Sequence, residues 1–141
     1  MVDDESIIRS LVKVANGCTD YEFEFYNDDV VGLDTMYDYN QGKGYINIEA
    51  SGKNIAICGD YNNGIKANSL ADCQEKIMKM LEEPIDCSFV LNDGFVCFYG
   101  PTLFFEKKLF EKDPENLACI LPNYVKIINA IGRAADKIFL D

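Results

Sequence analysis

The chain has 141 residues, 48% of them hydrophobic and 26% charged, and its formal net charge is −11. This length and apolar content suffice for one domain with its own core, without support from a metal or disulfides. The negative charge argues against direct binding to nucleic acid or to an anionic membrane, because phosphate groups would repel it. The sequence has no histidine, so it lacks the commonest general base and the commonest metal ligand.

The first residues place Asp3, Asp4 and Glu5 where a secretion signal would need positive charge, and no apolar run reaches the length of a membrane span. We therefore expect a soluble, cytoplasmic protein. In that compartment cysteines stay reduced, and free thiols are usually buried. Mostly buried, reduced thiols are expected at all six positions, Cys18, Cys58, Cys73, Cys87, Cys97 and Cys119.

The first half of the chain predicts a helix, a strand and a hairpin. A helix that ends at Asn16-Gly17 is indicated by apolar residues at helical spacing, Ile7, Ile8, Leu11, Val12 and Ala15. In residues 21–25 aromatic residues alternate with glutamates, which indicates a strand. Residues 45–50 and 53–59 are rich in β-formers, and the Ser51-Gly52 pair between them predicts a tight turn.

The second half begins with a helix over residues 69–81, which Asn68 or Ser69 can cap, and Asp72 follows three positions after Ser69 as in a capping box. Its inner stripe is expected to be Leu70, Cys73, Ile77 and Leu81, with Met80 as a further candidate, and Pro84 ends it. The stretch "CSFVLNDGFVCFYG" predicts a second hairpin, because Asp93-Gly94 suits a type I′ turn. A short strand is expected over residues 102–105.

The last part predicts a long helix over residues 116–139. Asp113-Pro114 suits a helix start, and Pro122 must kink or restart the helix. Its apolar face should leave the polar residues mainly elsewhere, namely Lys126, Asn129, Arg133 and Lys137. Taken together, the elements predict one α+β domain over residues 1–141, with an antiparallel sheet of about five to six strands packed against N-terminal, middle and C-terminal helices.

No motif indicates catalysis, a metal or a cofactor. "GDYNNG" fails as a calcium loop because Gly64 falls at the fifth ligand position and Ile65 at the turn glycine. "GKG" lacks the rest of a phosphate-binding loop, and no CxxC pair suggests zinc. The adjacent acids Asp28-Asp29 and Glu82-Glu83 are typical of surface charge. We expect a protein that is not an enzyme and that has no metal site or cofactor.

The strongest functional candidate is the acidic segment over residues 20–40, "DYEFEFYNDDVVGLDTMYDYN", with seven carboxylates, four tyrosines and no basic residue. Such a segment can simply be a solvated surface and loop. It also suits contact with a basic protein, because tyrosines supply contact area and carboxylates pair with arginine or lysine. The partner-binding candidates are Glu22, Glu24, Tyr26, Asp28, Asp29, Asp34, Tyr37, Asp38 and Tyr39.

The order of elements, including "YINIEASGKNIAICG", "SLADCQEKIMKML" and "CSFVLNDGFVCFYG", resembles the type III secretion chaperone-like fold with its YbjN-like branch. That resemblance implies a small, often dimeric protein that binds other proteins. Three hypotheses about function follow from the sequence. The acidic segment suggests an inhibitor, immunity or anti-defence protein that docks on a basic protein. The resemblance suggests a dimeric chaperone-like module that holds an extended peptide, and an enzyme of unfamiliar type is the third hypothesis.

Overall fold

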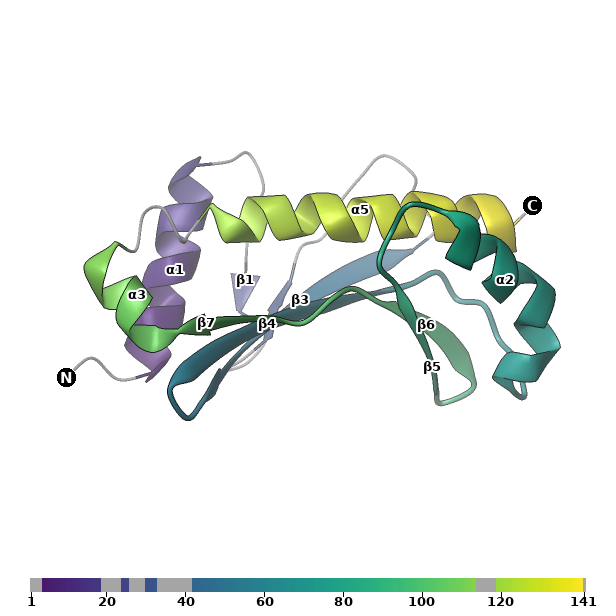
Figure 1. Ribbon diagram of the computed structural model, residues 1–141, viewed down its shortest axis with the longest axis horizontal. Helices are drawn as coiled ribbons and strands as arrows, with labels where there is room; N and C mark the ends of the chain where they lie inside the picture. The colour runs from purple at the N-terminus through teal and green to yellow at the C-terminus, as the bar shows by residue number, and fades with distance from the viewer. Residues whose placement is uncertain (1–3, 19–23, 26–29, 33–41, 114–118, 141) are drawn as a thin grey trace.

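The protein is an antiparallel sheet with its main helices packed on one face, as the computed structural model shows (Figure 1). The structure describes residues 4–18, 24–25, 30–32, 42–113 and 119–140. Helices α1 (Asp4–Cys18), α2 (Gln74–Glu82) and α5 (Ile120–Phe139) come from the beginning, middle and last part of the chain. The predicted α+β class is confirmed. None of the helices in the described ranges combines the length and apolar character that crossing a membrane requires.

The central strand of the sheet is β4 (Asn54–Asn62). On one side it pairs with β3 (Lys43–Ser51), and on the other with β6 (Phe95–Tyr99) and β7 (Leu103–Glu106) in succession. Strand β5 (Ser88–Asn92) pairs with the outer edge of β6. Two very short strands, β1 (Glu24–Phe25) and β2 (Val30–Gly32), extend the sheet beyond β3 in the order β1-β2-β3-β4-β6-β5.

Both predicted hairpins form, and one has a shifted turn. Asp93 and Gly94 have φ angles of 52° and 82°, as a type I′ turn requires. In the β3–β4 hairpin Ser51 pairs with Asn54, so the turn residues are Gly52 and Lys53 rather than Ser51 and Gly52. Gly52 has a φ of 59°, and a turn with positive φ at its first central residue favours glycine there.

Two short elements were not predicted. The segment over residues 28–38, read as a loop, contains β2, because the two valines Val30 and Val31 pair with Asn47 and Ile46 of β3. Directly after β7 the chain turns into α3 (Lys107–Lys112), which buries Phe110 with its ring edge-on to Phe105 at 6.2 Å. The predicted strand over residues 102–105 is otherwise confirmed as β7.

Helix α1 buries its five predicted apolar residues, whereas the middle helix differs in detail. It begins as the 3-10 helix η1 (Leu70–Cys73) after Ser69, whose side chain makes no capping hydrogen bond. In α2 Met80 is buried, whereas Leu81 is 66% exposed, so the expected inner position of Leu81 is wrong. Neighbouring helical residues point about 100° apart, and once Met80 faces the core Leu81 turns outward.

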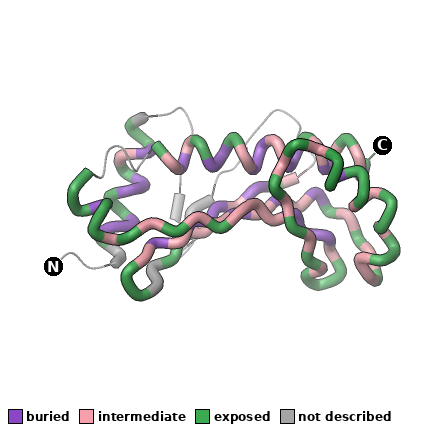
Figure 2. Tube along the Cα trace, in the orientation of Figure 1, coloured by how far each residue is buried: buried purple, intermediate pink, exposed green. Residues whose placement is uncertain are grey.

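Helix α5 packs along the sheet through an apolar face that alternates with exposed residues (Figure 2). Pro122 lies in the first turn of α5, where backbone N–H groups have no hydrogen-bond partner within the helix. The proline therefore fits the start of the helix without breaking a hydrogen bond. Lys126, Arg133 and Lys137 are exposed as expected. Asn129 is buried instead, and no described residue forms a hydrogen bond with its Oδ1.

The closest approach of α5 to the sheet is at two glycines. A Cβ added at Gly59 would lie 2.7 Å from Tyr124 Cε1, and one added at Gly100 would lie 2.8 Å from Tyr124 Oη. Asp60 of β4 pairs with Tyr99 of β6, and Ile57 of β4 pairs with Leu103 of β7. Between these two pairs, three residues (100–102) lie opposite only two residues of β4 (58 and 59). The connection from β6 to β7 therefore contains a β-bulge. The Tyr124 hydroxyl donates to the Pro101 carbonyl in this bulge at 2.7 Å.

Polar contacts hold the C-terminal half of α5 against β4 and α2. The Asp136 carboxylate accepts hydrogen bonds from the Tyr61 hydroxyl at 2.7 Å and from Asn63 Nδ2 at 3.1 Å. Lys76 of α2 donates to the Phe139 carbonyl at 3.1 Å, where a cation also suits the negative end of the helix dipole. Strand β4 and helix α2 are thereby both tied to the last two turns of α5.

We expect Gly59→Ala and Gly100→Ala to lower the free energy of unfolding by about 1–3 kcal/mol, because the added methyl group would overlap Tyr124. Urea unfolding followed by circular dichroism measures the change. Gly17→Ala is the control: no atom lies within 4 Å of its Cβ position, and alanine favours a helix. Stability of both sheet variants at the level of the Gly17 variant would contradict this packing.

Candidate functional site

Most of the predicted partner-binding residues lie outside the described part of the chain. Glu24 is the exception, and its backbone in β1 pairs with Gly32 of β2. Whether the set forms one surface therefore stays a prediction. The residues outside the described ranges are Glu22, Tyr26, Asp28, Asp29, Asp34, Tyr37, Asp38 and Tyr39.

The described residues show a different candidate, the face of the sheet opposite α5. Along β4, buried residues that face the helices alternate with half-buried ones on the other side. No described helix lies on that second side (Figure 1). We call the central part of this surface the open face and define it by seven residues of β3, β4 and β6: Tyr45, Asn47, Cys58, Asp60, Asn62, Cys97 and Tyr99.

Asp60 lies at the centre of the open face, in a row with two tyrosines. The strand register places Tyr45 of β3 directly opposite Asp60 on one side. Tyr99 of β6 is directly opposite Asp60 on the other side. Directly opposite residues in neighbouring antiparallel strands have side chains within contact reach. Among these seven residues Asp60 alone is ordinarily ionised at neutral pH, and Lys43 and Glu49 lie farther along the same side of β3.

The Asp60 carboxylate is half-buried without compensation. Among the described residues no hydrogen bond or ion pair reaches it, and burial raises its pKa to about 6. The effect extends to Tyr99, whose pKa is raised first by burial and then by the negative charge of Asp60. The open face therefore carries a negative charge that its described neighbours do not neutralise.

Three of the described cysteines, Cys58, Cys87 and Cys97, have the opposite of the pKa change that activates a thiol. Burial raises the pKa of Cys58 and Cys97, and it raises that of Cys87 to about 12, so these thiols ionise less readily than a free one. Cys58, Cys73, Cys87 and Cys97 are free thiols in the structure, as expected. The expected burial holds only for Cys97, because Cys119 is exposed and the other three are intermediate.

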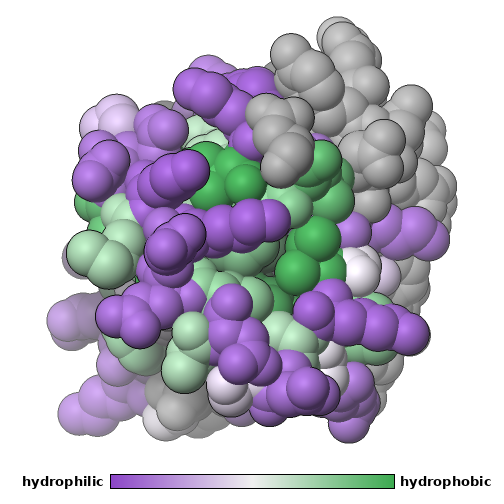
Figure 3. All heavy atoms as spheres, turned by 90° about the vertical axis from the view of Figure 1, so that its right-hand side faces the viewer, coloured by the Kyte–Doolittle hydropathy of each residue, from purple (hydrophilic) through white to green (hydrophobic). Residues whose placement is uncertain are grey.

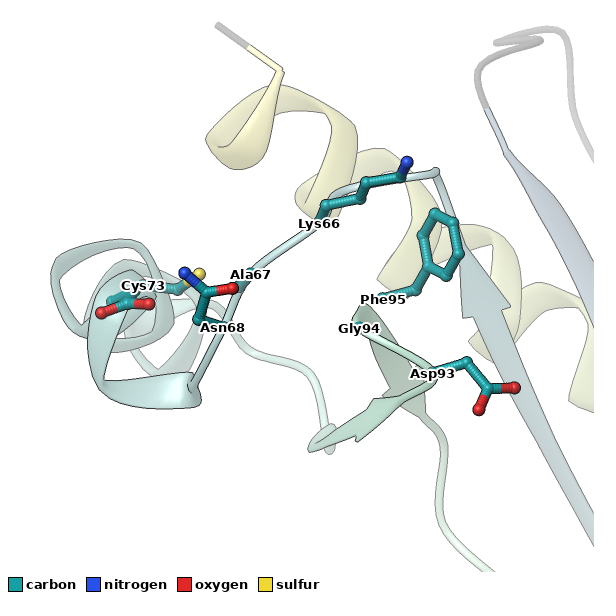
Figure 4. A pocket seen from close by; sticks show the side chains of 8 residues that line it. Lys66, Ala67, Asn68, Cys73, Asp93, Gly94 and Phe95 are labelled. Atoms are coloured by element: carbon teal, nitrogen blue, oxygen red, sulfur yellow. The ribbon is translucent and has the colours of Figure 1, made fainter.

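A hollow of about 520 Å³ lies elsewhere, between η1 and the β5–β6 turn (Figure 4). A bridge between Lys66 and Phe95 forms its floor, and the Lys66 ammonium lies 5.4 Å from the centre of the Phe95 ring. None of the buried polar atoms without a partner lines this hollow. Within the described ranges, no three cysteine or acidic side chains are grouped as a metal site would need.

The interpretation of the sequence missed the open face. It considered Asp60 only as a ligand in a calcium loop, and the rejection of that loop agrees with the position of Asp60 inside β4. The available signal was an aspartate, a poor strand former, within a run of alternating apolar residues. Asn47 lies opposite Cys58 on the same face, and its buried Oδ1 has no hydrogen-bond partner among the described residues.

Comparison of the chain with protein-family models, with curated proteins and with solved structures finds no match. The resemblance to the type III secretion chaperone-like fold thus stays a prediction.

We expect Asp60→Asn to stabilise the protein at pH 7.5. The folded pKa of about 6 lies above the usual aspartate value, so the native state binds more protons than the unfolded state between these values. Stability consequently falls as the pH rises through about 4 to 6, and the loss is complete above that window. The asparagine variant lacks this loss, and its advantage should vanish near pH 4.

Urea unfolding of both proteins at pH 4 and pH 7.5 measures this difference. The control is Asp93→Asn, which removes the same charge from an exposed turn where asparagine also accepts the positive φ. A wild-type protein as stable as Asp60→Asn at pH 7.5 would show that the carboxylate is neutralised in solution.

Proposed function

We propose that the protein is a non-catalytic binding module that docks on a basic protein, as an inhibitor, immunity protein or anti-defence protein would. The observation that carries the proposal is the composition of the open face. A sheet face that only meets water usually has many lysines and glutamates. The open face instead presents two tyrosines, two asparagines, one half-buried thiol and one aspartate without a partner among its described neighbours, and the charged Lys43 and Glu49 flank it on the same side of β3.

The acidic segment of residues 20–40 adds support, because the described parts of it join the same sheet. Strand β2 pairs directly with β3, which contributes Tyr45 and Asn47 to the open face. Charge balance points the same way, since residues 1–42 hold ten acids and two bases. A surface of this sign attracts a basic protein and accelerates its encounter.

An enzymatic role has less support. A catalytic carboxylate with a raised pKa normally works in a pocket that encloses the substrate. Asp60 has the raised pKa, but it does not line the hollow next to η1. The raised pKa values of Cys58, Cys87 and Cys97 also speak against an activated thiol at these positions.

Reversal of Asp28, Asp29, Asp34 and Asp38 to lysine should abolish partner binding and leave the fold intact. The partner is first recovered by affinity capture from an extract of the native host at low salt and identified by mass spectrometry. Affinity for that purified protein is then measured across a salt series, and it should fall steeply as salt rises because charge attraction is screened.

The matched control reverses four exposed acids of the helices, Asp72, Glu75, Glu82 and Glu111. Both variants undergo the same change in net charge, so only the position of the charges differs. Retained binding by the control and lost binding by the first variant would support the proposal. Affinity that does not change with salt would refute it.

A dimeric chaperone-like module is the second candidate, and α2 supplies the observation that favours it. Met78 and Leu81 are 57% and 66% exposed and lie three residues apart, on one side of the helix. Hydrophobic residues gather among charged ones at this end of the molecule (Figure 3). Exposed apolar surface of this kind often marks a contact between proteins.

If this candidate is right, the protein is a dimer that Met78→Lys combined with Leu81→Lys converts to a monomer, because two charges would be buried in the contact. Light scattering coupled to size-exclusion chromatography measures the mass. Leu109→Lys on α3 is the control, since Leu109 is also exposed but lies at the opposite end of the molecule (Figure 1). A wild-type protein that stays monomeric at high concentration rules the dimer out.

A further inference from the structure

We propose that Tyr45, Asp60 and Tyr99 form a binding seat for one arginine side chain of a protein partner. This inference rests on the proposed function and names the group that the open face recognises. The three residues come from three neighbouring strands, and the register places them in one row with the carboxylate in the middle. We call this row the arginine seat.

The spacing of the row suits a flat cation. Neighbouring strands lie about 4.8 Å apart, so the two tyrosines start about 10 Å apart with Asp60 between them. A planar group stacked between two rings needs about 7 Å, or roughly 3.5 Å on each side. A guanidinium can therefore enter between the tyrosine rings while its N–H groups reach the carboxylate below.

The seat also lacks the charge that an arginine would bring. No ion pair or hydrogen bond from a described residue reaches the Asp60 carboxylate. Lys66 lies over the Phe95 ring, and Lys43, a diagonal neighbour of Asp60 on the same side of β3, makes no ion pair with it. Asn47, next on β3, adds an acceptor oxygen without a donor among the described residues. The side-chain amide of Asn62, also on this face, donates to Cys97 Sγ at 3.7 Å rather than to the carboxylate.

Arginine fits these features better than lysine does. Its guanidinium is flat, stacks on aromatic rings and donates several hydrogen bonds in one plane, whereas the lysine ammonium is compact and strongly hydrated. Arginine also loses less hydration when it is half-buried beside a carboxylate. The seat should therefore distinguish these two basic residues, which a diffuse acidic surface would not.

The test uses the full chain and two probes, acetylated octa-arginine amide and octa-lysine amide, titrated at low salt. We expect Asp60→Asn to weaken octa-arginine binding about tenfold or more, because a charge-assisted pair is lost. Asp93→Asn, which removes the same charge elsewhere, should change it less than about twofold. The wild type should bind octa-arginine more tightly than octa-lysine.

The position of the bound probe is read from the tyrosine rings. With ring-labelled tyrosine, octa-arginine should shift the nuclear magnetic resonance signals of Tyr45 and Tyr99, assigned by single Tyr→Phe variants. Tyr99→Phe keeps the ring and should retain binding, whereas Tyr99→Leu removes it and should weaken binding. The Tyr99→Phe variant thereby separates loss of stacking from general damage to the sheet.

Equal affinities for Asp60→Asn and Asp93→Asn, or unshifted Tyr45 and Tyr99 signals on octa-arginine binding, would overturn the arginine seat. If the fourfold reversal in the acidic segment still abolishes binding of the natural partner in that case, the proposed function stands and only the seat is wrong. A wild-type protein that binds neither octa-arginine nor a basic partner overturns both.

Discussion

The contact between Tyr124 and the glycine pair Gly59 and Gly100 determines where the long helix sits on the sheet. Without side chains at these two positions the ring of Tyr124 lies directly against the backbone of two strands. The bulge between β6 and β7 brings the Pro101 carbonyl within hydrogen-bond distance of the tyrosine hydroxyl. Helix α5 in turn touches β3, β4, β6, α1 and α2, so the placement of the remaining elements depends on this contact.

Because the helices gather on one side, the two faces of β4 have opposite chemistry. Ile55, Ile57 and Tyr61 fill the core, and the alternate positions carry Cys58 and Asp60 on the open face. An aspartate that receives no hydrogen bond from the described residues lowers the stability of a central strand. A residue that lowers stability in this way is found most often where a protein binds or reacts.

The elements that could be predicted were those with a strong local signal. Asp93-Gly94 alone determines the β5–β6 hairpin, because few other pairs accept positive φ at both positions. The turn between β3 and β4 was predicted one residue too early, and this error changes the neighbour of Asp60. A turn at Ser51-Gly52 would place Lys43 opposite Asp60, which would form an ordinary ion pair. The observed turn at Gly52-Lys53 places Tyr45 opposite Asp60 instead. Both registers keep Asp60 on the same face, so the pattern of apolar residues could not tell them apart. The second tyrosine of the row, Tyr99, comes from a strand far along the chain, and local sequence signals do not specify that pairing.

The position of α5 in the chain affects how the protein is made. Every strand of the described sheet is synthesised before Ile120, yet the apolar side of β3, β4 and β6 is covered only when α5 arrives. During translation this apolar surface stays exposed to solvent until α5 emerges. An exposed apolar sheet is prone to aggregate. The ribosome, and any chaperone near its exit, would thus meet a sheet whose folding cannot be completed until α5 has emerged.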